Sequence, residues 1–522
     1  MKVLLLYPNT YGMNMIPPAL GIFTAILKNA GHELQLFDTT DYVEEYRNFD
    51  KEKSANLNAR PINDFSKLDE AQIYSSPIED FNSLVNSFKP RLIAVSCVED
   101  MFPRAIELLS SMKSSTNGDR PFVVMGGVFP TFAADVAYDN SNGCVDYILK
   151  GEGEKTILEL CDKLEKNESV AHIDGMYYVE KNVFSGDKVI NNHLPSPNSI
   201  SDIPIPDYSL FKESRFYRPM QGKVRRMFPI ETFRGCPYKC TYCNSPSQTT
   251  KYKDEINVNF FRKAEISRIE HEIETMINVY KADSLYFWAD TFLSWSKGDF
   301  YKFCDMYEKY KLPFWIQTRP ETIKKEYFER LKEIGLLRVA FGIEHGSEWF
   351  REKYLERKLK NSKIIEKLKI VTDMKIPISV NNIMGFPFET RELAFDTIEL
   401  NRNIDSDGTN AYTFVPFHGV PLRKVSEDNN FIKKGKIARS LMYMTMLDQP
   451  QFPKEEIEGI RRCFVLYVKM PKDRWNDIRK AESLTPEGDK ILKSLQKECS
   501  EKYMNYGDHD ATEVVDMVDF EK

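Results

Sequence analysis

The 522-residue sequence has no long apolar run and little excess charge of either sign. It contains no uninterrupted apolar stretch of about 18 residues, the length that spans a bilayer. The apolar start, Met1 to Pro8, has neither a basic flank nor a cleavage site, so we expect neither secretion nor a membrane span. A net charge of -6 gives no basic surface, which disfavours nucleic acid as a partner.

Cysteine is too scattered for a disulfide framework. Six of the nine cysteines are dispersed along the chain, at Cys97, Cys144, Cys161, Cys304, Cys463 and Cys499. This pattern indicates a reducing compartment, so we expect a cytoplasmic protein. The other three, Cys236, Cys240 and Cys243, stand close together and need a separate explanation.

The length predicts more than one domain, because a single hydrophobic core stops growing well below this size. Changes in pattern along the chain set the expected boundaries. They predict a first domain over residues 1–194, a linker over 195–225, a second domain over 226–424 and a helical carboxyl-terminal region over 425–522.

The first domain alternates strand and helix patterns. Strand-type apolar runs occur at Lys2–Pro8, Glu33–Asp38, Arg91–Cys97, Pro121–Gly127 and Asp146–Leu149. They predict a doubly wound parallel sheet, an α/β fold of Rossmann-like type, in which ligands bind outside the carboxyl ends of the strands. A polar insertion over residues 39–89 is too long for an ordinary connection, and the sequence predicts no role for it.

The second domain also alternates. Its strand candidates are Phe228–Arg234, Ser284–Asp290, Phe314–Arg319, Arg338–His345, Ile378–Gly385 and Thr409–Pro416, with helix-length segments between them. Six βα units predict a partial (β/α)6 barrel of TIM type. Active sites of such barrels lie at the carboxyl ends of the strands.

The clustered cysteines follow the first barrel strand in a CxxxCxxC arrangement from Cys236 to Cys243. Three thiolates on one short loop can hold three irons of a cubane cluster and leave the fourth iron open for substrate. A structural zinc site is the first alternative, but it needs four ligands, and no further His or Cys follows nearby. A chance cluster of free thiols is the second alternative.

At these residues the sequence resembles the radical S-adenosylmethionine (SAM) superfamily, whose motif has an aromatic residue before the last cysteine. Tyr242 supplies that residue. The resemblance implies a 4Fe-4S cluster held by Cys236, Cys240 and Cys243. It also implies that the fourth iron chelates SAM, that the reduced cluster cleaves SAM to a 5′-deoxyadenosyl radical, and that an electron donor such as flavodoxin or ferredoxin reduces the cluster.

Later strand ends also match the superfamily. The residues that we predict to contact SAM are Tyr242, Asp290, Gln317, Arg319, Glu344 and Gly385. Glu344, at a strand end, can accept hydrogen bonds from a ribose or an ammonium group, and Arg319 suits a carboxylate through bidentate pairing. For each polar residue taken alone, a role in a structural salt bridge explains its presence as well as contact with a ligand does.

The order of the two domains resembles the cobalamin-binding group of radical SAM enzymes, as do Met125-Gly-Gly-Val-Phe-Pro-Thr131 and Gly151-Glu-Gly-Glu154. The predicted cobalamin contacts are Asn9, Thr10, Ser96, Gly126, Gly127, Thr131, Gly151 and Glu152. The first loop contains no GxGxxG, which removes the best evidence for a dinucleotide site. It also lacks Asp-x-His-x-x-Gly, and His32 is the sole histidine near a strand of this domain, so we expect cobalamin without an axial histidine.

The resemblance implies an enzyme that methylates an unactivated carbon of a small-molecule substrate, using methylcobalamin. A second reading keeps both cofactors but ends in cyclisation, rearrangement or oxidation, as in tetrapyrrole cyclases. A third reading, from another class, is a cobalamin or redox sensor. A sensor needs an output module, and the segment after Val425 shows no nucleic-acid-binding motif.

Overall fold

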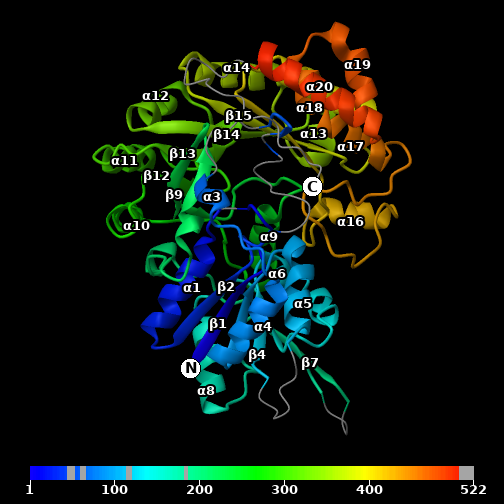
Figure 1. The fold of residues 1–522 in the computed structure, drawn as a ribbon. Helices are drawn as coiled ribbons and strands as arrows, with labels where there is room; N and C mark the ends of the chain where they lie inside the picture. Colours follow the sequence, from blue (N-terminus) through cyan, green and yellow to red (C-terminus); the bar gives the residue numbers. More distant parts are fainter. Residues whose placement is uncertain are drawn as a thin grey trace.

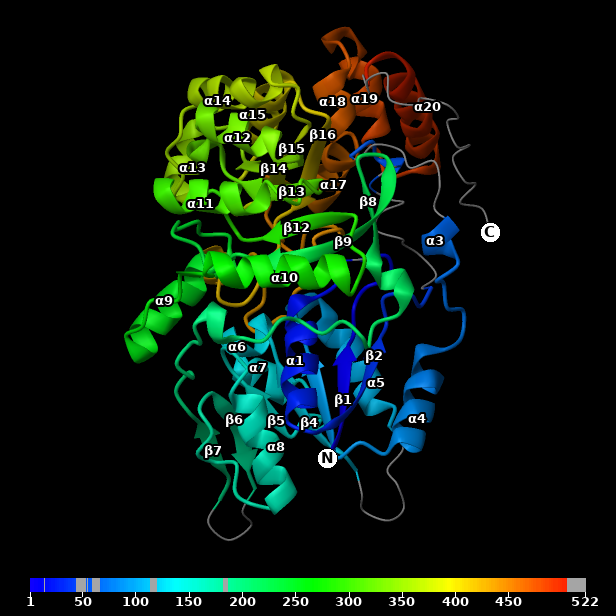
Figure 2. The same ribbon diagram turned by 90° about the vertical axis from the view of Figure 1, so that its left-hand side faces the viewer.

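The computed structural model describes residues 1–13, 15–43, 53, 55–58, 66–112, 120–181 and 186–504. Two seven-stranded sheets form the centres of two α/β units, which lie one below the other in Figure 1. The carboxyl-terminal helices, orange and red, stand beside the upper unit in Figure 2. None of the helices in the described ranges is long and apolar enough to cross a membrane.

The first sheet has the strand order β2-β1-β3-β4-β5-β6-β7. Its strands are β1 (Lys2–Tyr7), β2 (Glu33–Asp38), β3 (Leu92–Ser96), β4 (Phe122–Gly126), β5 (Tyr147–Leu149), β6 (Met176–Glu180) and β7 (Lys188–Asn191). The five predicted strands are present and parallel. The antiparallel hairpin β6–β7, which extends the sheet past β5, was not predicted.

Helices cover both faces of this sheet. They are α1 (Pro18–Asn29), α4 (Pro77–Phe88), α5 (Phe102–Ser110), α6 (Val128–Phe132), α7 (Ala134–Asp139) and α8 (Thr156–Lys166), while the short α3 (Ser66–Asp69) lies apart from the sheet in Figure 2. In β1, Val3 and Leu5 pack in the cluster that contains α1 and α8, whereas Leu4 and Leu6 pack in the cluster that contains α4 to α7. The continuous apolar run of β1 follows from this burial on both faces.

The second sheet has the order β16-β15-β14-β13-β12-β9-β8. Its strands are β8 (Tyr217–Met220), β9 (Lys223–Glu231), β12 (Ser284–Trp288), β13 (Phe314–Thr318), β14 (Leu336–Glu344), β15 (Ile378–Met384) and β16 (Gly408–Thr413). All six predicted barrel strands are present and parallel, which confirms the partial barrel. The antiparallel strand β8 lies inside the segment 195–225 that we expected to be a linker.

The outer face of the half-barrel is covered by helices. They are α10 (Ile266–Asn278), α11 (Lys297–Tyr307), α12 (Lys325–Glu333), α14 (Asn361–Asp373) and α15 (Arg391–Arg402), while α13 (Glu348–Leu355) packs with Phe386 at the carboxyl end of the strands. The carboxyl-terminal region is helical as predicted, with α17 (Lys454–Arg462), α18 (Phe464–Lys469), α19 (Trp475–Ala481) and α20 (Pro486–Lys502). Residues 505–522 of this region lie outside the described residues.

Part of the polar insertion closes the open side of the half-barrel. Leu57 is buried among the carboxyl-terminal helices together with Phe452 and Ile457. The Asn58 side chain donates a hydrogen bond to the Thr409 carbonyl in β16, at 3.3 Å. The insertion therefore belongs to the first domain in sequence but packs against the edge strand of the second.

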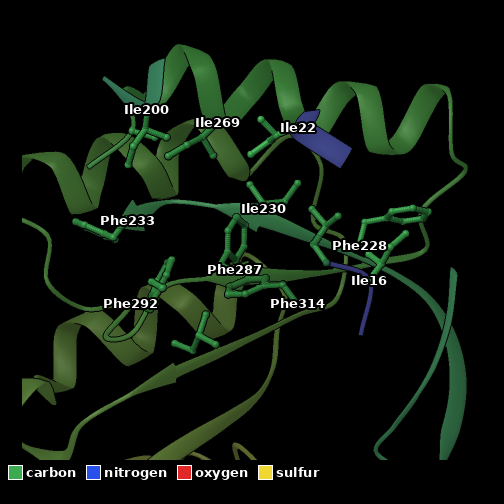
Figure 3. Packing of buried hydrophobic residues seen from close by; sticks show 14 of the residues in the cluster. Ile16, Ile22, Ile200, Phe228, Ile230, Phe233, Ile269, Phe287, Phe292 and Phe314 are labelled. Atoms are coloured by element: carbon green, nitrogen blue, oxygen red, sulfur yellow. The ribbon is translucent and has the colours of Figure 1, made fainter. Parts of the chain in front are cut away.

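One hydrophobic cluster runs through both units. Ile22 of α1 packs with Phe228 and Ile230 of β9 and with Ile269 of α10, as Figure 3 shows. These side chains are each less than 3% exposed. Because such burial removes several apolar side chains from water at once, the two units have a fixed relative placement.

Glu272, a buried acid in α10, is expected to make the stability of the protein depend on pH. Burial raises the pKa of Glu272 to about 7, against the opposing effect of Arg268, whose Nη1 donates to Glu272 at 2.6 Å. The folded protein therefore binds this proton more tightly than the unfolded chain, and stability is lost as pH rises from about 4.5 to about 7. The loss is at most about 3 kcal/mol.

We expect Glu272→Gln to remove this loss. As pH rises from 5 to 8, the unfolding free energy of the variant should therefore increase relative to that of wild type. Urea unfolding at several pH values measures it. Glu274→Gln, at an exposed site on the same helix, is the matched control. A difference that does not change with pH would contradict the assignment.

Candidate functional site

The cysteine loop joins β10 (Phe233–Arg234) to α9 (Asn244–Ile256). Gly235 turns the chain with a φ of +81°, in the left-handed region that favours glycine. Cys236 and Cys240 are 8% and 7% exposed, and Cys243 caps the start of α9. The three predicted cluster ligands therefore lie on one loop at the rim of the half-barrel.

The surroundings of the thiols suit a negatively charged cluster. Arg319 Nη1 lies 3.0 Å from Cys240 Sγ, and Thr291 Oγ1 lies 3.7 Å from Cys236 Sγ. Burial raises the pKa of Cys236, so the thiolate form needs a bound cation or metal. Among the described residues, no three His, Cys, Asp or Glu side chains converge to hold a single metal ion.

A buried ion network continues from Arg319. Its Nη2 donates to Glu321 at 2.6 Å, and Arg357, 4% exposed, contacts the same carboxylate at 3.2 Å. Burial alone would raise the pKa of Glu321, but Arg357 and Arg319 lower it to about 2. The Nε atom of Arg319 is buried without a hydrogen-bond partner, which leaves a donor for an anionic ligand.

Arg357 also joins two of the predicted SAM residues. Its Nη1 donates to the Tyr242 hydroxyl at 3.4 Å and lies 3.3 Å from Glu344 Oε1. Burial raises the pKa of Glu344, while Arg357 opposes the shift. Sequence reasoning missed Arg357 and Glu321, because both lie in connections after the strand ends rather than at the ends themselves.

The other predicted SAM residues line the same rim. Asp290 follows β12 and accepts a hydrogen bond from Ser245 Oγ. Gln317, in β13, donates to the Ala289 carbonyl at 3.0 Å. Gly385 follows β15, and its N–H donates to Glu389. The structure thus brings all six residues to the carboxyl ends of the strands, and their contacts with SAM stay predictions.

The predicted cobalamin residues lie at the carboxyl edge of the first sheet. Asn9 and Thr10 follow β1, Ser96 ends β3, and Gly126 ends β4. The strand order changes direction between β1 and β3, the point at which doubly wound sheets bind ligands. Asn9 is 1% exposed and its Oδ1 has no partner, so an acceptor is available there.

Two predicted glycines serve the fold itself. A Cβ on Gly127 would lie 2.3 Å from the Cys97 carbonyl oxygen, and one on Gly151 would lie 2.6 Å from the Tyr252 hydroxyl. Protein atoms thus fill the space on the Cβ side of both glycines, and their predicted contacts with cobalamin stay predictions. At Gly126, by contrast, a Cβ would meet nothing nearer than the Leu149 carbonyl oxygen at 3.5 Å.

Thr131 and Glu152 also have structural contacts. Thr131 is 2% exposed, donates to the Gly127 carbonyl and accepts from the Gly151 N–H. Glu152 pairs with Arg234 at 2.9 Å and with Arg262, both in the second unit. Their roles as cobalamin contacts stay predictions, and the structure gives Glu152 a second role as an anchor between the two units.

Two histidines lie at or next to this carboxyl edge: His193 follows β7, and His418 of the second unit pairs with Glu99 after β3. His32 precedes β2 at the amino edge, where its Nδ1 lies 3.1 Å from the Met1 amino group. The expectation that cobalamin binds without an axial histidine stays a prediction.

Glu99 connects the loop after β3 to the loop after β16. This carboxylate, 3% exposed, accepts 2.7 Å hydrogen bonds from the His418 and Ala438 N–H groups, and its Oε1 lies 2.7 Å from His418 Nδ1. The His418 carbonyl in turn accepts from Asn244, next to Cys243, at 2.8 Å. The carboxyl edge of the first sheet is therefore tied to the cysteine loop by a short chain of hydrogen bonds.

Replacing Glu99 tests this connection. In Glu99→Gln, the amide nitrogen would face backbone donors, and we expect a loss of about 1–3 kcal/mol in unfolding free energy. Denaturant unfolding measures it, with Glu107→Gln, exposed on α5, as the control. Equal stability of the two variants would show that the hydrogen bonds do not join the units.

The glycines supply a second test, made on cofactor-free protein. Gly127 has a φ of +119° in addition to its contact with Cys97, so we expect Gly127→Ala to lose at least about 2 kcal/mol of stability. Gly126→Ala should remain close to wild type in stability. Thermal unfolding of both variants checks this, and a stable Gly127→Ala protein would contradict the assignment.

Two family models match the chain. The Radical SAM superfamily model matches residues 230–400, and the B12 binding domain model matches residues 67–161. A relative from Pyrococcus horikoshii, named "Uncharacterized methyltransferase PH0819", is 25% identical over 401 residues, which cover 76% of this chain and 82% of the relative.

Two solved structures share the fold along nearly the whole chain. The radical SAM methyltransferase TsrM from Kitasatospora setae, with cobalamin and a 4Fe-4S cluster bound, has a TM-score of 0.61 at 13% identity and covers 96% of this chain and 99% of its own. The cobalamin-dependent SAM radical enzyme OxsB, with aqua-cobalamin and SAM bound, has a TM-score of 0.64 at 16% identity. The match covers 96% of this chain and 71% of OxsB. The chain therefore contains a B12 binding domain followed by a radical SAM domain.

Proposed function

We propose that this enzyme transfers a methyl group to a carbon atom of a small molecule, using a cluster on the cysteine loop and cobalamin on the first sheet. The observation that carries the proposal is the meeting of the two carboxyl edges. Glu99, at one edge, accepts a hydrogen bond from the His418 N–H, and the His418 carbonyl accepts one from Asn244 beside the cysteine loop.

Cys236, Cys240 and Cys243 would hold the cluster, and Arg319 would pair with the carboxylate of SAM. Glu344 and Tyr242 would contact its other polar groups. When bound, the cluster supplies the electron that cleaves SAM, and cobalamin supplies a methyl group. The unpartnered Nε of Arg319 and Oδ1 of Asn9 support these positions, because buried polar atoms normally have partners.

The residues of the chain itself orient the ligands and exclude water. The pairing of Glu321 with Arg319 and Arg357 fixes the guanidinium groups at the rim, so their donors are oriented before a ligand arrives. Phe386, buried and 5.9 Å from the Tyr242 ring, and Phe350 beside it cover the same end with apolar surface. Apolar surface around a radical site limits side reactions with water.

Cyclisation, rearrangement or oxidation remains the alternative outcome for the same two cofactors. The products separate the two: methylation consumes SAM to both S-adenosylhomocysteine and 5′-deoxyadenosine, whereas the alternative forms 5′-deoxyadenosine alone. Anaerobic incubation with candidate small molecules and a reductant, with both products quantified, tests the proposal. Turnover without any S-adenosylhomocysteine would favour the alternative.

The cysteine loop makes the sharpest prediction for this function. We expect reconstituted wild-type protein to bind about four irons per chain and to form 5′-deoxyadenosine. Cys240→Ala should lose the cluster absorbance and the product while still binding cobalamin. Cys304→Ala, at a buried thiol in α11, is the matched control and should keep both. Iron content and 5′-deoxyadenosine at wild-type levels in Cys240→Ala would refute the cluster assignment.

A further inference from the structure

The inner face of the half-barrel is accessible, unlike its outer face. In β13, Phe314 and Ile316 are fully buried against the helices, whereas Trp315 and Gln317, which point the other way, are only partly buried. In the neighbouring strand β12, Trp288 is 37% exposed. Side chains alternate between the two faces of a strand, so this interior keeps aromatic surface available to a ligand.

Two arginines lie on the same inner face. Arg218 and Arg225 are directly opposite each other in the β8–β9 hairpin. The Arg218 guanidinium lies 5.2 Å from the centre of the Trp315 ring and 5.8 Å from that of Tyr286. Arg338 is in register with Trp315 on the next strand, so a third arginine lies beside the same rings.

Arg218 and Arg225 have no acidic partner among the described residues, and Arg225 Nε is buried without a hydrogen bond. The nearest inner-face acid in the hairpin strand, Glu231, is already paired with Arg234 through two bonds of 2.8 and 3.0 Å. Guanidinium groups bind carboxylates and phosphates through paired donors, and leaving such donors unsatisfied in a partly buried site is costly.

The insertion of the first domain adds another cation. Lys53 lies with its ammonium 5.8 Å from the ring centre of Tyr412 in β16. Tyr412 shares a face with Asn410, whose side chain donates to Asn381 in the neighbouring strand β15 at 3.0 Å. Positive charge and aromatic rings therefore approach the interior from both edges of the sheet.

We propose that the half-barrel interior binds a substrate that combines a flat aromatic ring system with an anionic group. The ring system packs on Trp288, and the anion pairs with Arg218 and Arg225. This inference rests on the proposed function for the reaction, and it adds the chemical class of the substrate. Aromatic stacking and charge-assisted hydrogen bonds are the two interactions that this surface offers.

Binding of 2-naphthoate and its neutral analogue 2-naphthamide to the cofactor-loaded protein tests the anionic part. By anaerobic calorimetry we expect wild type to bind the carboxylate at least about ten-fold more tightly than the amide. Arg218→Gln combined with Arg225→Gln should abolish the preference. Lys223→Gln, an exposed change in the same strand, should keep it. If the double variant is unstable, Arg225→Gln alone replaces it, because the Arg225 Nε makes no hydrogen bond that the change would break. This single variant should show a smaller preference for the carboxylate than wild type.

Saturated decahydro-2-naphthoate tests the aromatic part. We expect wild type to bind this saturated acid about three- to ten-fold more weakly than 2-naphthoate. In Trp288→Leu the two acids should bind with equal affinity, because the aromatic contact is lost. No carboxylate binding at millimolar concentrations, equal binding of acid and amide, or an unchanged preference in the arginine variants would overturn the inference. A protein that shows the preference but never cleaves SAM would contradict the proposed function and leave this binding site standing.

Discussion

The structure depends on burial that is shared between two units. Ile22 in α1 and Phe228 in β9 belong to one hydrophobic cluster, so neither sheet can move without exposing apolar surface. Since parallel strands place ligand-binding loops at their carboxyl ends, the relative orientation of the sheets decides which loops meet. In this chain the loops after β3 and β16 meet at Glu99 and His418.

Buried charge is distributed along the same boundary. Most buried ions are paired within the protein, as Glu152 is with Arg234 and Glu321 is with Arg357. The polar atoms left without partners include Asn9 Oδ1, Arg319 Nε and Arg225 Nε. They lie at the edge of the first sheet, at the barrel rim and in the barrel interior, which are the places where we assign cobalamin, SAM and substrate. Paired ions thus set the shape of this boundary, and these three unpartnered atoms are groups that a ligand could bond.

The sequence predicts the regular parts of this molecule well. Buried parallel strands such as β1 and β12 are short apolar runs, and the cysteine loop is a local motif, so both can be recognised without a structure. The strand β8 contains Tyr217, Arg218 and a proline, and has no apolar pattern to reveal it. The contact between Glu99 and His418 joins residues 319 positions apart, and the role of Gly127 depends on the carbonyl of Cys97. Such contacts follow from tertiary packing and have no local signal.

The most direct test of the account is the magnetic interaction between the two metal centres. Protein loaded with both cofactors, with the cluster reduced and cobalamin as cob(II)alamin, has an unpaired spin at each site. If the two carboxyl edges meet as Glu99, His418 and Asn244 indicate, electron paramagnetic resonance should show mutual broadening or faster relaxation of both signals. A spectrum equal to the sum of the two isolated signals would contradict the account.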